Sequence, residues 1–319
     1  MTGKQNDIFM TPDNKIRLFE HGAPGSQGLK LKRKYYTEAM PDGKVKHIVQ
    51  HVADPDIVPY IPDGDSIGDD TGKKKIPAVL IIPGGAFRRL VYNFEGEDVA
   101  KWLNSMGIAA FVLECRLPSD EHDNAEDVPL IDAMRAMRVI RGRAQEFGID
   151  ETKIGVMGFS AGGFIAALLS TAYESDVYAD YKYKDEYDEL SARPDFTVCS
   201  YPVISIDDCI EAGKRYMTEE QVLERISCNM TKILRKYNPD KLVRPDMPPV
   251  FICETDDDRT TLSENSVGFY MAARKAGVSA ELHIFRTGGH GYGCGDDTAQ
   301  TGEWKVLFTK WIKSLGITG

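Results

Sequence analysis

A serine between two glycines is the residue of this chain best suited to covalent chemistry. Ser160 lies at the centre of a G-x-S-x-G pentapeptide at 158–162, after an apolar strand-like stretch at 154–157 and before a helix-forming stretch at 164–169. A serine on a sharp strand-to-helix turn is held in a strained backbone with its hydroxyl exposed, and small neighbours let strand and helix approach closely. The pattern predicts a nucleophile, although a glycine-rich turn can also match by chance or cradle a phosphate.

An acid and a histidine follow the serine in the order that such a turn requires. On this scaffold a triad runs serine, acid, histidine along the chain. An apolar strand at 250–253 ends in an acidic turn at 256–258, and a strand at 280–285 ends in the glycine-rich loop that carries His290. Both lie just past the carboxyl ends of predicted strands, where sites form in open α/β sheets. We predict that His290 is the general base and that one of the three aspartates orients it, while the others lie in a solvated turn.

A glycine-rich turn early in the chain supplies a candidate oxyanion hole. An aliphatic stretch runs directly into the turn at 83–86, about 75 residues before the serine. On this scaffold one donor is the N–H of the residue after the nucleophile, Ala161, and the second comes from the loop after an early strand. We predict that Gly84 and Gly85 supply that loop, although a tight Pro-Gly-Gly turn without this role would have the same sequence.

Composition and charge exclude several function classes. The 319 residues are 42% hydrophobic and 28% charged, and we expect a single domain at 1–319. The net charge of −10 argues against nucleic-acid binding, which needs clustered positive charge. We interpret the short basic runs at 30–36 and 72–75 as solvated faces. No apolar run is long enough to span a membrane, so no membrane partner is expected.

Cysteine spacing and the N-terminal residues indicate the compartment. The six cysteines show neither CxxC nor a metal-ligand spacing, and Cys115, Cys199 and Cys253 fall at or just after apolar strands. We therefore expect no metal and free thiols in a reducing environment. The first 15 residues lack the apolar region of a signal peptide, which together with the cysteines predicts a cytoplasmic chain.

Apolar periodicity predicts alternating strands and helices after an irregular or antiparallel lead-in at 1–75. The predicted strands are 78–82, 108–114, 153–158, 196–202, 249–254 and 280–286, and the predicted helices are 95–106, 127–147, 161–172, 262–276 and 302–314. This alternation is typical of an α/β fold with a mostly parallel sheet and helices on both faces. The tyrosine-rich segment 173–195 and the segment 205–246 interrupt it, and each is either part of a small cap over the site or a solvated crossover.

The linked motifs resemble the α/β-hydrolase esterase and lipase family, in particular the branch related to bacterial acetylxylan and feruloyl esterases. The matching segments are IIPGGAF, residues 94–118 and 129–163, SYPVIS, DDDRTTLSENS and GGHGYG. The resemblance as a whole covers residues 78–314. The resemblance implies an α/β-hydrolase fold with Ser160 as nucleophile and His290 as general base. It selects Asp258 as the acid, four residues before Leu262, with Asp257 as the fallback.

The resemblance also implies the reaction. We expect a serine carboxylic-ester hydrolase that works through an acyl-enzyme without metal or organic cofactor, and that deacetylates plant-derived carbohydrate or a small-molecule ester. The alternatives are a general short-chain carboxylesterase or lipase, a feruloyl esterase, and a non-catalytic hydrolase-like binding protein. The chain departs from the family pattern at three places. The family often has a glycine where Ala86 stands, a histidine where Phe94 stands, and Val-Pro where Thr261-Leu262 stand. The first two positions lie near the expected pocket and bear on the substrate.

Overall fold

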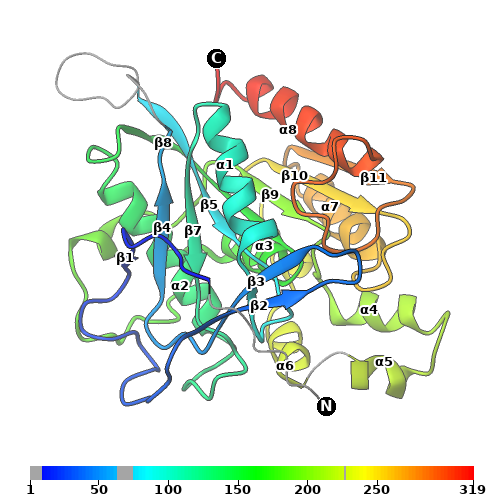
Figure 1. Ribbon diagram of the computed structural model, residues 1–319, viewed down its shortest axis with the longest axis horizontal. Helices are drawn as coiled ribbons and strands as arrows, with labels where there is room; N and C mark the ends of the chain where they lie inside the picture. The colour runs from blue at the N-terminus through cyan, green and yellow to red at the C-terminus, as the bar shows by residue number, and fades with distance from the viewer. Residues whose placement is uncertain (1–8, 63–74, 226–227) are drawn as a thin grey trace.

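The computed structural model describes residues 9–62, 75–225 and 228–319. These residues build an eight-stranded sheet with the order β1-β4-β7-β5-β8-β9-β10-β11 (Figure 1). Its strands are β1 (Ile16–Arg17), β4 (Asp56–Tyr60), β7 (Ala109–Glu114), β5 (Ile76–Ile82), β8 (Ile149–Phe159), β9 (Thr197–Ser200), β10 (Val250–Thr255) and β11 (Ala280–Phe285). Neighbouring strands from β7 to β11 pair in parallel, whereas β4 is antiparallel to β7 and β1 is antiparallel to β4. The mostly parallel sheet predicted from the sequence is confirmed.

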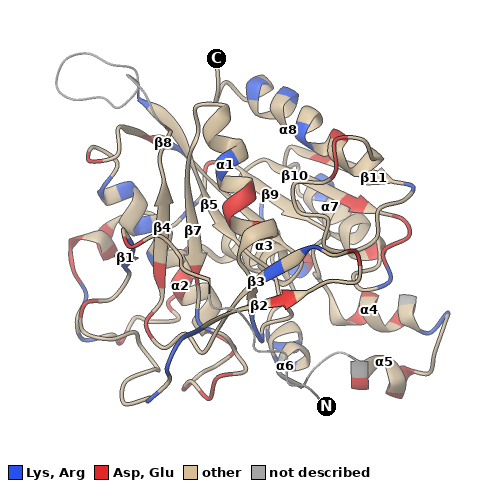
Figure 2. Ribbon diagram, viewed as in Figure 1, with Lys and Arg blue, Asp and Glu red and all other residues tan. Residues whose placement is uncertain are grey.

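The central strands are buried on both faces. Every residue of β7 is buried, as are all residues of β5 except Pro77. Parallel strands that are covered by helices on both sides read as continuous apolar runs, which is how these strands appear in the sequence. The charged residues lie mainly on the helices and loops around the sheet (Figure 2). The parallel core therefore forms a rigid platform whose carboxyl edge can carry a site.

Helices cover both faces of the sheet (Figure 1). Helices α1 (Asp98–Ser105) and α8 (Glu303–Ser314) lie on one face and meet where Trp102 contacts Trp304. Helices α2 (Val128–Gly142), α3 (Ala161–Ala172) and α7 (Glu264–Lys275) lie on the other. Each matches a predicted helix, with two notable differences at the ends. The predicted helix 95–106 begins as a π-helical turn (Asn93–Glu97), and the predicted helix 127–147 ends at Gly142.

The N-terminal lead-in is largely antiparallel. Strand β2 (Lys34–Ala39) pairs with β3 (Val45–Gln50), and β6 (Leu90–Val91) joins them in a small second sheet. The interpretation of the run 30–36 as a solvated face is wrong at Arg33. Its guanidinium lies 2.6 Å from Asp56 and 2.6 Å from the fully buried Glu114, and a buried carboxylate needs such a partner. Of the second basic run, 72–74 lie outside the described residues.

The two interrupting segments fold differently. Segment 173–195 lies along α2, where Arg135 pairs with Asp185 and Arg138 contacts Tyr178. These contacts favour the crossover interpretation. Segment 205–246 forms α4 (Ile206–Gly213), α5 (Glu219–Arg225), α6 (Cys228–Lys236) and the 3-10 turn Pro239–Lys241. A salt bridge from Lys236 to Asp127 ties α6 to the start of α2, and a cap role for this segment stays a prediction.

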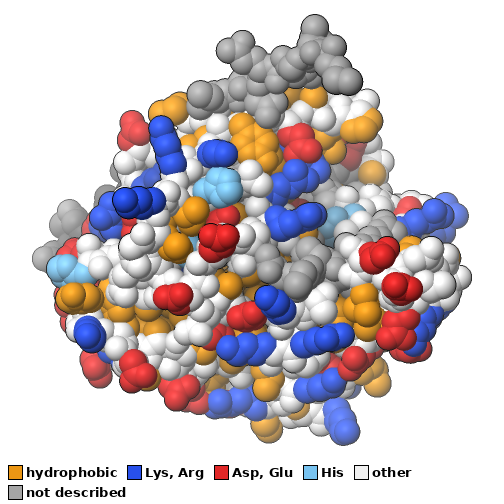
Figure 3. Space-filling model, turned by 90° about the horizontal axis from the view of Figure 1, so that it is seen from below, with side chains coloured by type: hydrophobic (Ala, Val, Ile, Leu, Met, Phe, Trp, Pro, Cys, Tyr) orange, Lys and Arg blue, Asp and Glu red, His pale blue; other side chains and the backbone are white. Residues whose placement is uncertain are grey.

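The surface is mixed in charge. Seen from below, the side toward which the parallel strands end, positive and negative side chains are interspersed (Figure 3). Among the described residues, no helix is both long and apolar enough to cross a membrane.

Candidate active site

The turn between β8 and α3 holds Ser160 in a rare backbone conformation. Its φ is 53° and its ψ is −119°, a region that L-residues adopt only when the surrounding structure enforces it. A Cβ atom added at Gly158 would overlap the backbone of Gly162, and one added at Gly162 would overlap the carbonyl oxygen of Ile82. Both glycines of the pentapeptide are therefore required by close backbone approach, as the sequence predicts.

Ser160, His290 and Asp258 come together at the carboxyl edge of the sheet. His290 Nε2 lies 2.9 Å from Ser160 Oγ, and His290 Nδ1 lies 2.6 Å from Asp258 Oδ2. The Asp258 side chain is buried, and its Oδ1 accepts the backbone N–H groups of Thr260 and Thr261. When Nδ1–H donates to the carboxylate, Nε2 is left to accept the serine proton. This geometry can generate a reactive serine oxygen.

The neighbouring Asp257 binds the backbone of the histidine loop instead of the imidazole. Asp257 is exposed, and its Oδ1 accepts the N–H groups of Gly289 at 2.8 Å and Gly288 at 2.9 Å. These backbone hydrogen bonds lower the pKa of the Asp257 carboxyl below its ordinary value. Asp257 thus restrains the loop that carries His290, while Asp258 contacts the imidazole itself.

Thr261 is a polar neighbour of the acid and base that the sequence did not assign to the site. Its Oγ1 lies 3.0 Å from Asp258 Oδ2, 3.1 Å from His290 Nδ1 and 3.0 Å from the carbonyl oxygen of Tyr201. In the sequence this threonine is distinguished only as a departure from the family pattern. Thr261 lies in the short segment between Asp258 and α7, and its backbone N–H also donates to Asp258 Oδ1 at 3.0 Å.

The glycines of the candidate oxyanion hole differ in what their N–H groups contact. The N–H of Gly84 donates to Glu95 Oε2 at 2.8 Å, so Gly84 can line the hole without being a free donor. Gly84 still lies against the serine, because a Cβ atom placed on it would be 2.8 Å from Ser160 Cβ. In the part of the chain that the structure describes, the N–H groups of Gly85 and Ala161 have no acceptor. These two amides are the available donors, and removing one donor costs about 3–4 kcal/mol in comparable sites.

Glu95 is the main side chain near the site that the sequence analysis missed. It sits in the π-helical turn, is 4% exposed, and accepts the Tyr201 hydroxyl through Oε1 at 3.0 Å. Burial raises the pKa of the Glu95 carboxyl above its ordinary value, against the opposing effects of nearby His290 and of the hydrogen bonds from Tyr201 and Gly84. Single π-helical turns occur frequently at functional sites.

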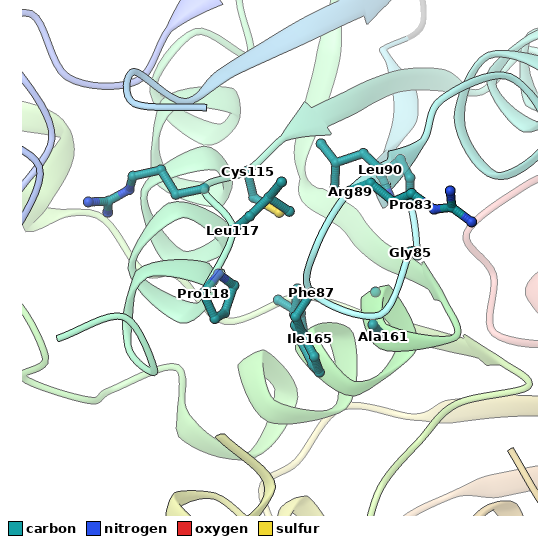
Figure 4. Close-up of a pocket in the computed structure, with 13 residues that line it drawn as sticks. Pro83, Gly85, Phe87, Arg89, Leu90, Cys115, Leu117, Pro118, Ala161 and Ile165 are labelled. Carbon is teal, nitrogen blue, oxygen red and sulfur yellow. The ribbon is translucent and has the colours of Figure 1, made fainter. Parts of the chain in front are cut away.

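A small, mostly apolar cavity adjoins the two available donors (Figure 4). It lies between the turn after β5, the segment after β7 and the first turn of α3. The side chains and backbone that enclose it include Pro83, Gly85, Phe87, Leu90, Cys115, Leu117, Pro118, Ala161 and Ile165. Phe87 in its wall and the preceding Ala86 both have a φ of 57°, a conformation that glycine adopts more readily. The frequent glycine at position 86 in the family pattern thus has a backbone explanation.

Within the described ranges, no group of three or more His, Cys, Asp or Glu side chains is arranged to hold a metal ion. The cysteines at 115, 199 and 253 are buried free thiols. Burial raises the pKa of the Cys253 thiol to about 12, which is unfavourable for a thiolate nucleophile or ligand.

Comparison with known proteins decides the family. The BD-FAE family profile matches residues 67–272, more than half of the chain. The chain belongs to the BD-FAE family. The match contains Ser160 and Asp258 and ends before His290, so the place of the histidine rests on the geometry above.

Two curated relatives of this BD-FAE chain are named as an acetylxylan esterase and an endo-1,4-beta-xylanase. An acetylxylan esterase of Xylanibacter ruminicola is 30% identical over 240 residues, which are 75% of this chain and 45% of that protein. The chain spans less than half the length of the curated relatives that it matches.

Solved structures establish the architecture. The acetyl ester-xyloside bifunctional hydrolase of Caldicellulosiruptor lactoaceticus is 38% identical, with 83% of this chain and 90% of that chain covered and a TM-score of 0.66. The carboxylesterase Cest-2923 of Lactobacillus plantarum has a TM-score of 0.65 over 91% of this chain and 99% of its own at 19% identity, a likeness of fold alone. The chain has the α/β-hydrolase fold predicted from its sequence.

Proposed function

We propose that this chain is a serine esterase that removes acetyl or similar small acyl groups from plant-derived carbohydrate. The observation that carries the proposal is the contact of His290 Nε2 with Ser160 Oγ at 2.9 Å, with Asp258 on the opposite ring nitrogen. A serine hydroxyl in this setting is suited to attack an ester carbonyl.

In the acylation step, Ser160 Oγ attacks the ester carbonyl carbon while its proton passes to His290 Nε2. The carbonyl oxygen becomes negative and accepts hydrogen bonds from the N–H groups of Ala161 and Gly85. Asp258 holds the imidazole in the correct tautomer and stabilises its positive form. When the tetrahedral intermediate collapses, the C–O bond to the alcohol breaks and His290 gives its proton to the departing oxygen.

Deacylation uses the same groups in the reverse order. His290 accepts a proton from a water molecule as the water attacks the acyl-serine carbonyl. The second intermediate expels Ser160 Oγ, which regains its proton, and the free acid leaves. This chain's own residues account for every proton transfer in the scheme.

The substrate part of the proposal is supported by the comparisons. The curated relative is named for acetylxylan and the 38% identical solved structure for an acetyl ester and a xyloside. A general short-chain carboxylesterase and a feruloyl esterase are the competing outcomes.

Hydrolysis of p-nitrophenyl acetate tests the nucleophile. Ser160→Ala should abolish turnover while the far-UV circular dichroism spectrum stays unchanged, and retained turnover would remove Ser160 from its role. Labelling by a fluorophosphonate probe distinguishes an enzyme from a non-catalytic scaffold, because a scaffold that only binds a ligand should not react.

A substrate series tests the acyl group and the alcohol. Acetylated xylo-oligosaccharides, p-nitrophenyl esters of increasing acyl length and a feruloyl ester are compared, with product release followed by mass spectrometry. A maximum at two carbons together with deacetylation of the glycan supports the proposal. A preference for six carbons or more, or failure on every acetylated glycan, favours the general carboxylesterase.

We also propose a cytoplasmic location. The cysteines that the structure describes as free, at 115, 199, 209, 253 and 294, suit a reducing compartment. Cell fractionation tests this location, and recovery of the native chain outside the cell would contradict it.

A further inference from the structure

A buried carboxylate connects two loops of the candidate site. Gly84 lies in the turn after β5, and its N–H donates to Glu95 Oε2 at 2.8 Å. Tyr201 follows β9, and its hydroxyl donates to Glu95 Oε1 at 3.0 Å. Gly84 and Tyr201 are more than 100 residues apart in the chain, and this carboxylate is bonded to both.

Tyr201 extends the connection to the histidine loop. Its hydroxyl accepts the backbone N–H of Gly293 at 3.0 Å while donating to Glu95. The Tyr201 ring is fully buried and packs edge-on against the His290 ring, with centroids 5.0 Å apart. One tyrosine therefore contacts both the imidazole and the backbone three residues beyond it.

The histidine loop and the π-helical turn also touch directly. Gly293 has a φ of 53°, and a Cβ atom added there would overlap the carbonyl oxygen of Phe94. The Gly293 carbonyl oxygen in turn accepts the indole N–H of Trp304 at 3.1 Å. The turn that carries Glu95 and the loop that carries His290 are therefore packed without room for a side chain between them.

The chemistry of this carboxylate suggests more than filling space. Burying a carboxyl group is costly unless its oxygens are satisfied, and an apolar side chain would fill the same volume without that cost. Both partners of Glu95 are donors aimed at separate oxygens. Such a fully satisfied polar network fixes the position of everything bonded to it.

We propose that Glu95, acting through Tyr201, is a positioning residue that holds the oxyanion turn and the histidine loop in one mutual arrangement. By engaging the Gly84 N–H, Glu95 fixes the Pro83–Gly84 peptide, which immediately precedes the peptide whose N–H, that of Gly85, is available to the substrate oxygen. By holding the Tyr201 hydroxyl, it also fixes Gly293 and the ring on which His290 rests. This inference rests on the esterase function proposed above.

Two conservative variants test the connection. Tyr201→Phe removes only the hydroxyl and leaves Glu95 Oε1 and the Gly293 N–H without their partner. Glu95→Gln keeps the volume and an acceptor for Gly84, but it presents an NH₂ group where the Tyr201 hydroxyl needs an acceptor. We expect each to lower kcat on p-nitrophenyl acetate by about 10- to 100-fold, somewhat less than loss of a whole oxyanion donor, with KM changed less than about threefold.

An inhibitor and a double variant separate positioning from a merely structural role. A trifluoromethyl ketone that mimics the tetrahedral intermediate should bind each single variant more weakly in proportion to its loss of kcat/KM. The double variant Glu95→Gln/Tyr201→Phe should be no worse than the poorer single variant, because both changes break one hydrogen-bonded chain.

Tyr92→Phe is the matched control. Tyr92 is also buried and lies just before the π-helical turn, but its hydroxyl contacts the hydroxyl of Tyr60 at 3.0 Å. It should keep the kcat and the inhibitor affinity of the unaltered chain. The proposal is overturned if the folded Glu95→Gln and Tyr201→Phe variants keep the kcat or the inhibitor affinity of the unaltered chain. It is also overturned if the loss of kcat in the double variant equals the product of the two single losses.

The Ser160→Ala variant separates this inference from the proposed function. If Ser160→Ala retains turnover, the proposed function fails. If Ser160→Ala loses turnover while Glu95→Gln and Tyr201→Phe keep full activity, only this inference is refuted.

Discussion

Asp258 Oδ2 lies 2.6 Å from His290 Nδ1, whereas the carboxylate of the adjacent Asp257 accepts two backbone N–H groups of the same loop. Consecutive residues thus act on the side chain and on the backbone of one histidine loop. The sequence resemblance selected Asp258 with Asp257 as the fallback, and the distances now give each a separate physical role.

This division predicts unequal effects of two matched substitutions. Asp258→Asn should lower kcat by about 10⁴-fold, because the amide favours the wrong imidazole tautomer. Asp257→Asn keeps one acceptor oxygen for the loop amides and should lower kcat less than about tenfold. Steady-state kinetics on p-nitrophenyl acetate measures both, and the reverse ranking would assign the acid to Asp257.

The hydroxyl of Thr261 should matter for rate rather than for folding. Thr261→Val preserves the shape and removes the contacts with Asp258 and His290. Loss of about 1 kcal/mol, the usual net value of one such hydrogen bond, would lower kcat roughly fivefold. Thr261→Ser retains the hydroxyl and should stay within twofold of the unaltered chain. Equal rates for the valine and serine variants would show that the hydroxyl does not act on the pair.

The glycines of the turn around Ser160 should not tolerate a methyl group. In Gly158→Ala and Gly162→Ala the new Cβ would overlap backbone atoms, which cannot rotate away. We expect a loss of about 1–3 kcal/mol or more in the free energy of unfolding, measured by urea denaturation. Gly268→Ala is the control, since this glycine is inside helix α7, alanine is the better helix former, and the new Cβ would approach only the Asp208 side chain, at 3.1 Å, and no backbone atom. Wild-type stability in both turn variants would contradict the close approach described here.

The acid sensitivity of the fold should depend on His122. This side chain is buried with Nδ1 3.0 Å from Ser26 Oγ, and burial together with the nearby Arg116 guanidinium lowers the pKa of His122 to about 4. The folded state therefore binds this proton less readily than the unfolded chain, whose histidine pKa is about 6.5. Its stabilising contribution is complete above about pH 6.5 and is lost as the pH falls through about 4.

Urea denaturation between pH 7 and pH 4 checks this expectation. His122→Gln should flatten the dependence of the free energy of unfolding on pH, because the group that must take up a proton is gone. The exposed His21 serves as control, and His21→Gln should leave the slope unchanged. An unaltered slope in His122→Gln would show that other groups govern the acid transition.

The sequence predicts what is local or ordered along the chain, and misses what tertiary packing creates. The turn at Ser160, the strand before Asp258 and the glycine loop around His290 each leave a local pattern, and the order of the three segments is fixed by the scaffold. Glu95 leaves no such pattern. It lies in the charged run FEGED, a pattern that predicts the exposed start of a helix. Only the packing of Gly84 and Tyr201 around it makes Glu95 a buried hydrogen-bond acceptor.

The same limit explains the smaller errors. Arg33 belongs to a basic run typical of a solvated face, yet it pairs with Glu114, which no periodicity could identify as a buried acid. The helix predicted over 127–147 ends at Gly142, and the following residues form a turn that closes at Gly148 with a φ of 64°. The residues between Gly142 and Gly148 therefore belong to this turn and not to a continued helix.

Strand β4 has a consequence for any attempt to trim the protein. It pairs with β7 from Asp56 opposite Glu114 to Tyr60 opposite Ala110, and it precedes residue 67, where the family match begins. A fragment that begins at residue 67 and keeps the C-terminal strands and helices would leave the buried edge of β7 with unpaired N–H and C=O groups, a template for self-association. Such a fragment should precipitate or form higher oligomers, because the antiparallel lead-in covers this edge of the eight-stranded sheet.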